Sequence, residues 1–191
     1  MIGPELLQAI HAVFNGKRAR ALWFKTRYAI LAAFFVLLCT QVKPAWFSPG
    51  FYVALFGELI QIWSFASLDK NNMISAKGPY MFVRNPMYIG RFFLVLGCLL
   101  VTGYIVAVPV LAVLYYFYAV NRTRREEERL RALFGEAYGN YCRGVNRFVP
   151  SLKAFERRSL FFFKWRLLVR NHGLQNLVAT LGGFFVLYLF A

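Results

Sequence analysis

Acidic residues are scarce in this 191-residue sequence, which holds 8 Asp and Glu against 23 Lys and Arg. Charged residues of both signs make up 16% of the chain, whereas a water-soluble domain usually contains about a quarter. This shortage argues against a soluble globule. Cysteines are also few: Cys39, Cys98 and Cys142 are odd in number and scattered, so neither a disulfide framework nor a metal site is indicated.

Apolar and aromatic residues are abundant instead. They make up 59% of the chain, with 21 Phe and 11 Tyr, and the mean hydropathy is +0.48. A disordered basic tail would lack this apolar mass. A nucleic-acid binder would explain the net charge of +15 but not the aromatic content. The composition therefore predicts an integral membrane protein whose partner is the bilayer and not a nucleic acid.

Four stretches with few charges predict membrane-crossing helices, each of which needs ~20 residues. They cover residues 21–42, 44–68, 86–121 and 171–191. The third is too long for one crossing, and Gly103 is the expected turn between two short helices. The predicted fold is thus an all-α integral membrane protein with about five transmembrane helices. Residues 4–21 and 160–169 carry apolar residues at helical spacing among cations, which predicts interfacial amphipathic helices.

These elements predict four consecutive parts of the chain. They are an interfacial helix in residues 1–20, a four-helix membrane core in 21–121, a cytoplasmic helix with a closing segment in 122–152, and an interfacial plus final membrane helix in 153–191. Loops rich and poor in Lys and Arg alternate, so the amino end and both long polar loops are expected to be cytoplasmic. The membrane itself, bacterial inner or endoplasmic reticulum, is left open.

The first polar segment, residues 77–90, contains a Gly-Pro and an Asn-Pro pair, both of which favour turns. Pro86 is expected to open a helix, because its missing N–H has no cost at the first helical position. The free N–H groups at that helix end suit an anion or a polar cofactor. An ordinary loop-to-helix junction, with Tyr80 and Tyr88 as interfacial anchors, is the alternative.

The second polar segment, residues 121–141, is expected to form one amphipathic helix. Glu126 and Glu127 fall within its apolar stripe, whereas Glu128 points away. A carboxylate on the packed side of a helix is unfavourable unless it is paired or used. An ion pair with Arg84 or Arg122 is the structural alternative. The stripe consists of Leu130, Leu133, Phe134, Ala137, Tyr138 and Tyr141.

Glu58 lies in the middle of the second predicted span. Ionisable groups at that depth usually face a cavity or a partner. The alternative is a neutral Glu that hydrogen-bonds a neighbouring helix, and the sequence does not decide between the two.

The two polar segments together resemble a known family. G-P-Y-M-F-V-R-N-P-M-Y-I-G, residues 78–90, resembles the G-x-Y-x-x-x-R-H-P-x-Y-x-G motif of the isoprenylcysteine carboxyl methyltransferase and phospholipid methyltransferase superfamily. E-E-x-x-L-x-x-x-F-G-x-x-Y-x-x-Y, residues 126–141, is similar to the second half of that family's cofactor site. R-F-V-P, residues 147–150, is similar to the segment with which that family's sequence pattern ends. The resemblance covers residues 50–152, and the segment after Pro150 has no counterpart in it.

The resemblance implies S-adenosylmethionine as the methyl donor and a lipid or lipidated acceptor that enters from the bilayer. Arg122 and Asn85 are the predicted catalytic residues, and Arg122 and Glu58 the predicted substrate contacts. The predicted cofactor-binding residues come from both segments and an adjoining wall: Tyr80, Arg84, Asn85, Pro86, Met87, Tyr88, Glu126, Glu127, Asn72 and Ile74.

One departure from the motif bears on the acceptor. Asn85 stands where the motif has His, which removes any role for imidazole basicity. Together with the cations around Arg122, this favours an anionic carboxylate or phosphate oxygen, which needs no base. A phospholipid amine N-methyltransferase, an NADPH-dependent enzyme similar to sterol reductases, and a non-enzymatic transporter or lipid-binding protein are the alternatives. The oligomeric state is left open.

Overall fold

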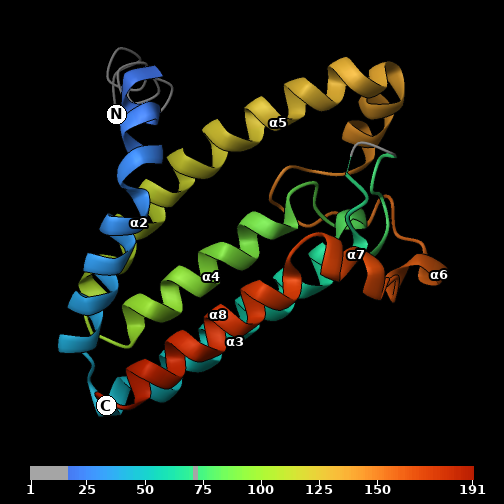
Figure 1. Ribbon diagram of the computed structural model, residues 1–191. Helices are drawn as coiled ribbons and strands as arrows, with labels where there is room; N and C mark the ends of the chain where they lie inside the picture. The colour runs from blue at the N-terminus through green and yellow to red at the C-terminus, as the bar shows by residue number, and fades with distance from the viewer. Residues whose placement is uncertain (1–16, 71–72) are drawn as a thin grey trace.

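The computed structural model describes residues 17–70 and 73–191, and every regular element within those ranges is a helix. This confirms the all-α prediction. Figure 1 shows α3, α4, α5 and α8 running in roughly the same direction, with α3 and α8 adjacent, α5 above α4, and α2 at a steep angle to them. The long helices are α2 (Lys17–Thr40), α3 (Pro44–Ser67), α4 (Pro86–Leu100), α5 (Val108–Gly144) and α8 (Gly173–Tyr188); the short ones are η1 (Gly78–Met81), η2 (Ile105–Ala107), α6 (Arg157–Leu160) and α7 (Trp165–Arg170).

The five long helices lie where the five membrane spans are predicted. Within the part of the chain that the structure describes, one segment, Ile105–Gly144, is long and apolar enough to cross a membrane by length and composition. Tyr28–Thr40, Pro86–Leu100 and Gly173–Tyr188 are apolar but shorter. The five crossings therefore stay a prediction. The predicted interfacial helix of residues 4–21 lies mostly outside the described residues, and Lys17 already belongs to α2.

Proline and glycine set several of the helix boundaries as expected. Pro44 begins α3 and Pro86 begins α4, each in the first turn, where the missing N–H is harmless. Gly103 adopts a φ of 71° in the turn that follows α4, which confirms the predicted hairpin. The chain then enters η2 and α5 without another long loop.

Small residues allow α3 and α4 to pack closely. A Cβ added to Gly57 would collide with the backbone of Gly90, and one added to Gly97 would collide with that of Gly50. These pairs repeat every seven residues along both helices, with Ala54 between them, so the backbones meet along one seam. The seam fixes the position of the amino end of α4, where the first motif lies.

The carboxyl-terminal helix α8 is attached to α3 by a buried carboxylate. Glu58 is fully buried and accepts hydrogen bonds from Asn176 Nδ2 at 2.9 and 2.8 Å and from Thr180 Oγ1 at 3.0 Å. Near the other end of this contact, Asn171 Nδ2 donates to the backbone oxygens of Phe65 and Leu68 at 2.9 and 2.7 Å. These bonds satisfy acceptors at the end of α3 and fix the turn between α7 and α8.

Two predictions about helix continuity are wrong. The fourth span and the second polar segment form one helix, α5, with no boundary at residue 121, but Gly135 interrupts it with φ 52° and ψ −128°. Leu133 and Ala137 are consequently exposed, and the single stripe predicted for residues 121–141 does not form. The predicted interfacial helix of residues 160–169 is also split, because Lys164 N donates to Ala66 O at 3.0 Å and holds an extended linker against the end of α3.

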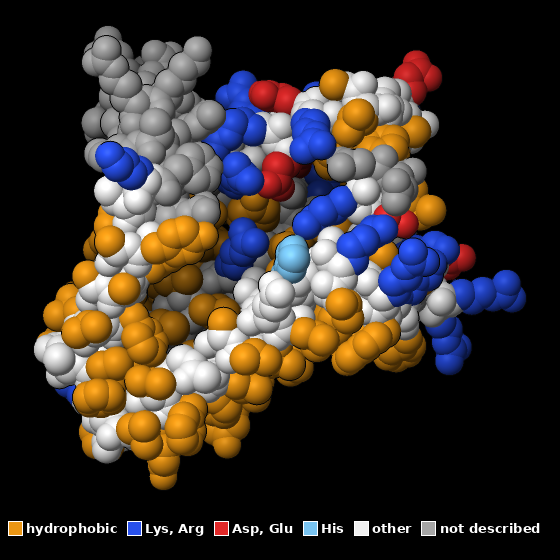
Figure 2. Space-filling model, in the orientation of Figure 1, with side chains coloured by type: hydrophobic (Ala, Val, Ile, Leu, Met, Phe, Trp, Pro, Cys, Tyr) orange, Lys and Arg blue, Asp and Glu red, His pale blue; other side chains and the backbone are white. Residues whose placement is uncertain are grey.

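Charge and apolar surface separate along the length of the molecule. Figure 2 shows apolar side chains gathered over the end where the α2–α3 and α4–α5 turns lie, and Lys and Arg gathered toward the opposite end. The amino end of α4, the α7–α8 turn and the second half of α5 lie at this charged end.

Candidate functional site

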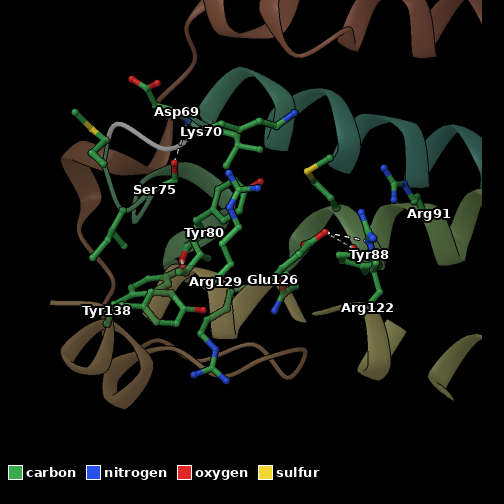
Figure 3. A pocket seen from close by; sticks show the side chains of 18 residues that line it. Asp69, Lys70, Ser75, Tyr80, Tyr88, Arg91, Arg122, Glu126, Arg129 and Tyr138 are labelled. Atoms are coloured by element: carbon green, nitrogen blue, oxygen red, sulfur yellow. Dashed lines mark hydrogen bonds and ion pairs between the residues drawn. The ribbon is translucent and has the colours of Figure 1, made fainter. Parts of the chain in front are cut away.

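A cavity of about 380 Å³ lies where the amino end of α4 faces the middle of α5. The loop after α3, the short helix η1 and the last turns of α5 close it (Figure 3). Its lining combines both sequence motifs and consists of Leu68, Asp69, Lys70, Met73, Ile74, Ser75, Tyr80, Arg84, Asn85, Met87, Tyr88, Arg91, Arg122, Glu126, Arg129, Leu130, Tyr138 and Tyr141. The volume falls within the ~300–1,000 Å³ range typical of small-molecule sites.

Backbone contacts from the closing segment hold the first motif in place. Val83 and Asn146 form an isolated parallel bridge, and Arg84 N donates to Asn146 O at 2.8 Å. The hydroxyl of Tyr141 donates to the backbone oxygen of Tyr80 at 2.7 Å. Tyr141 can reach this oxygen because the break at Gly135 turns the last part of α5 back toward the cavity. The two motifs are therefore joined directly.

Glu126 lies on the cavity side of α5. Its carboxylate accepts a hydrogen bond from the Tyr88 hydroxyl at 3.0 Å and pairs with Arg122 at 3.2 Å, one helical turn away. The side chain keeps 45% of its exposure, so a carboxylate oxygen is accessible to a molecule in the cavity. Figure 3 shows Glu126, Tyr88 and Arg122 meeting at one end of the cavity, with Arg91 beyond them.

Glu127, one residue later, lies in a different environment. Its side chain is 5% exposed and is bound by Arg147 at 2.6 and 3.1 Å, by Arg84 at 3.3 Å and by Asn85 Nδ2 at 3.4 Å. Burial alone would raise the pKa of Glu127, but the hydrogen bond from Arg147 and the charge of Arg84 hold it below its ordinary 4.5. Glu127 thus links the first motif, α5 and the closing segment, and it does not line the cavity.

Two buried donors in the cavity wall have no hydrogen-bond partner among the residues that the structure describes. They are the Tyr80 hydroxyl and Arg84 Nε. Burial raises the pKa of Tyr80 above its ordinary 10.0, so the hydroxyl stays protonated and can donate. An unpartnered buried donor is unfavourable, and a ligand with acceptor oxygens or nitrogens would satisfy both groups.

Most of the predicted site residues come together around this cavity. They are Ile74, Tyr80, Arg84, Asn85, Met87, Tyr88, Arg122 and Glu126. Pro86 is buried in the first turn of α4 and does not line the cavity, and Asn72 lies outside the described residues. Glu58, predicted to contact substrate, is instead buried between α3 and α8, which is the helix-packing alternative.

Sequence reasoning missed several charged residues of the lining, namely Asp69, Lys70, Arg91 and Arg129. Arg91 had a usable signal, since it is the one charge in the otherwise uncharged run of residues 86–121. Its guanidinium lies over the Tyr88 ring, 5.5 Å from the centroid, which turns it toward the cavity. Asp69 pairs with Arg170 of α7, a contact between distant residues that no local pattern reveals.

Comparison with known proteins gives two matches and one absence. A model of the phospholipid methyltransferase family matches residues 46–137. A protein-S-isoprenylcysteine O-methyltransferase from Schizosaccharomyces pombe is 28% identical over 82 residues, which cover 43% of this chain and 35% of that protein. The chain thus spans about a third of the length of this relative. No solved structure matches the chain.

The matched region contains most of α3, all of η1 and α4 and about the first four fifths of α5, and so most of the cavity wall. The motifs that carry the resemblance face each other across one cavity, as a shared site requires. Both matches support assignment of the chain to the superfamily of isoprenylcysteine carboxyl methyltransferases and phospholipid methyltransferases.

Proposed function

We propose that this protein transfers a methyl group from S-adenosylmethionine to a membrane-embedded lipid or lipidated acceptor through an anionic carboxylate or phosphate oxygen. The observation that carries the proposal is the single cavity formed by both family motifs, with Tyr80, Tyr88 and Glu126 in its wall. The matches to the superfamily support the reaction class. The cofactor and the acceptor are the proposal.

The donor set of the cavity fits this cofactor. Glu126 offers a carboxylate to an ammonium or sulfonium group, and tyrosine rings attract such cations through their faces. The unpartnered Tyr80 hydroxyl and Arg84 Nε are suited to a carboxylate or to ring and ribose acceptors. Met87 and Ile74 add apolar surface for a nucleoside. These residues would hold the cofactor.

When bound, S-adenosylmethionine would supply a methyl group on a positively charged sulfur, and in-line attack on the methyl carbon would break the carbon–sulfur bond and leave its electron pair on the sulfur. An anionic oxygen forms the new bond with its own electron pair, so no residue has to remove a proton. The protein then has to orient the acceptor and exclude water. Arg122, already beside Glu126 at the cavity rim, is placed to meet the acceptor's negative charge.

The Asn85 amide is not a base, and its Nδ2 donates to Glu127 at 3.4 Å. This side chain therefore supports the first motif instead of accepting a proton. An amine acceptor would need such a group, and an anionic oxygen would not. The geometry of Asn85 is thus consistent with the anionic acceptor and less so with amine methylation.

A membrane location with five crossings, and with the amino end and the cavity on the cytoplasmic side, belongs to the same proposal. It is supported by the apolar segment Ile105–Gly144 and by the shorter apolar helices beside it. The basic residues at the cavity end agree with the positive-inside rule. In this arrangement the cofactor enters from the cytoplasm and the acceptor from the bilayer.

The proposal is tested with the purified full chain in detergent. S-adenosylmethionine or its demethylated product should raise the unfolding temperature, because a ligand that binds the folded state stabilises it. Glu126→Ala should remove the shift, whereas Glu128→Ala, on the exposed face of α5, should keep it. Stabilisation by NADPH alone would refute the methyltransferase proposal, and no response to either compound would favour a carrier.

The acceptor is identified by a second measurement. Labelled methyl groups from S-adenosylmethionine are offered to a total lipid extract together with the protein, and the labelled species is isolated. A methyl ester of a carboxylate or phosphate supports the anionic acceptor. Label on nitrogen refutes it. Arg122→Ala should lower turnover while leaving cofactor binding largely intact, since its proposed contact is with the acceptor.

A further inference from the structure

A second cavity, of about 450 Å³, lies beside the first and shares part of its wall. Lys70, Met87 and Arg91 line both cavities. The rest of its lining comes from the end of α3 and from the α7–α8 region: Phe65, Asn171, His172, Gln175, Asn176 and Ala179. Phe65, Lys70, Met87 and Arg91 lie within the region that matches the family model, whereas residues 171–179 lie outside it, so the α7–α8 wall is an addition to the matched region.

The lining of the second cavity is positively charged and contains no carboxylate. Arg84 and Arg122 in the first cavity each have a glutamate partner, but Lys70 and Arg91 form no ion pair with any residue that the structure describes. The Arg91 guanidinium is only partly exposed and is held over the Tyr88 ring. Two cations that line one cavity and form no ion pair with a described residue favour the binding of an anion.

The far wall of the second cavity is rigidly held. His172 precedes α8 with φ 62° and ψ 25°, a left-handed conformation that is uncommon for a residue other than glycine. Such conformations persist only where the surroundings impose them, and they concentrate at functional sites. Here Asn171 binds the end of α3 on one side, and Asn176 binds the buried Glu58 on the other.

The second cavity also has apolar surface suited to a lipid. Phe65, Met87 and Ala179 contribute to its lining beside the polar groups. Figure 2 shows Lys and Arg side chains gathered at the charged end, with apolar side chains covering the helices that run away from it. A molecule with an anionic head and apolar chains matches both surfaces, whereas a small soluble anion would use only the first.

We propose that the second cavity binds the head group of an anionic membrane lipid, through a phosphate or carboxylate paired with Lys70 and Arg91. His172, just before α8, and Gln175, in its first turn, are placed to add hydrogen bonds. The shared wall at Met87 and Arg91 would hold this head group next to the cavity assigned to the methyl donor. This inference rests on the proposed function in one respect: the bound lipid is the methyl acceptor.

Lipid affinity tests the inference without measuring turnover. The purified full chain is placed in phosphatidylcholine nanodiscs with or without phosphatidic acid, and lipid binding is followed by native mass spectrometry and by the unfolding temperature. Phosphatidic acid should bind in preference to phosphatidylcholine and should raise the unfolding temperature. Inorganic phosphate alone, in a parallel arm, should give no comparable stabilisation, because the apolar surface would stay unfilled.

Variants then locate the lipid in the second cavity. Arg91→Gln and Lys70→Gln should each weaken phosphatidic acid binding on the order of tenfold, the usual effect of losing one charge-assisted contact. His172→Asn keeps a residue that tolerates the left-handed conformation and should weaken binding severalfold. Arg124→Gln is the matched control, because Arg124 is highly exposed and pairs with Glu128 away from both cavities. It should change binding less than twofold.

The outcomes separate this inference from the proposed function. Loss of lipid preference in the Arg91 and His172 variants, with S-adenosylhomocysteine binding retained by His172→Asn, supports the inference. An unchanged preference in all three variants overturns it, as does equal stabilisation by inorganic phosphate. Lack of S-adenosylhomocysteine binding by the unaltered protein would refute the proposed function, yet selective phosphatidic acid binding would still establish the anionic lipid site.

Discussion

Glu126 and Glu127 are neighbours in the sequence, yet replacing each with glutamine should have opposite consequences. Glu127 is 5% exposed and is bound by two guanidinium groups and an amide, whereas Glu126 is 45% exposed and faces the cavity. We therefore expect Glu127→Gln to lower stability while changing ligand binding little. Glu126→Gln should lower ligand affinity while changing stability little.

The size of the Glu127 effect follows from its partners. Removing one member of a buried ion pair costs about 3–5 kcal/mol, because the remaining charge is left without compensation. Arg84 is 12% exposed and meets this condition, whereas Arg147 is 35% exposed and can recover much of its solvation. We therefore expect Glu127→Gln to lower the free energy of unfolding by about 3 kcal/mol, at the lower end of that range.

The same helix supplies a matched control. Glu128 pairs with Arg124, but both side chains are highly exposed, at 65% and 72%. Exposed pairs of this kind contribute about 0–1 kcal/mol, so Glu128→Gln should be nearly neutral. Denaturant unfolding in detergent measures the stability of each variant, and calorimetric titration with S-adenosylhomocysteine measures its affinity for that ligand. Glu126→Gln should lower this affinity on the order of tenfold. Equal stability of the Glu127 and Glu128 variants, or loss of binding only in Glu127→Gln, would refute this division of roles.

Three further changes have defined signs. The pKa of Glu127 is lowered in the folded protein, so the stability that its carboxylate contributes is complete above the ordinary pKa of 4.5 and is lost as the pH falls through the folded pKa. The difference in unfolding temperature between the unaltered protein and Glu127→Gln should therefore shrink below pH 4.5. Tyr80→Phe should weaken S-adenosylhomocysteine binding in calorimetry but leave the unfolding temperature unchanged or slightly raised, since the lost hydroxyl has no partner among the described residues. A lower unfolding temperature would contradict this expectation. Gly97→Ala should destabilise the protein by ~1–3 kcal/mol, because the added Cβ collides with α3. Gly182→Ala is the control in the same unfolding assay: its Cβ meets open space, so the change should be neutral or stabilising by ~0.5–1 kcal/mol.

The helix boundaries could be predicted because their signals are local. Pro44 and Pro86 begin helices because a residue without an N–H is harmless in the first turn. Gly103 forms the predicted turn because its φ of 71° is accessible to glycine. The gathering of both motifs at one cavity followed from their sequence resemblance, without any knowledge of the packing. For the helix boundaries and the Gly103 turn, the deciding residues lie within a few positions of the feature that they determine.

The seam between α3 and α4 could not be predicted in the same way. Gly50 and Gly57 look like ordinary glycines of an apolar helix, and their close contact with Gly97 and Gly90 is a property of two segments about forty residues apart. The attachment of α8 is similar, because Glu58 is satisfied by Asn176 and Thr180 across more than a hundred residues. Sequence reasoning could state that Glu58 needs a partner, but not which helix provides it.

The separation of Glu126 from Glu127 shows why helical periodicity misjudged the site. A helical projection places both carboxylates in the stripe that continues to Tyr138 and Tyr141, as though one straight helix presented them all to the same neighbour. Gly135 ends that geometry with a φ of 52°, and an added Cβ there would meet nothing within 4 Å, so its backbone conformation and not lack of space calls for glycine. Beyond the break the chain returns to α5, where Arg147 binds Glu127 together with Arg84 and Asn85, whereas Glu126 faces the cavity. Two adjacent acids of one helix thus differ in role: Glu127 is a structural residue and Glu126 faces the cavity.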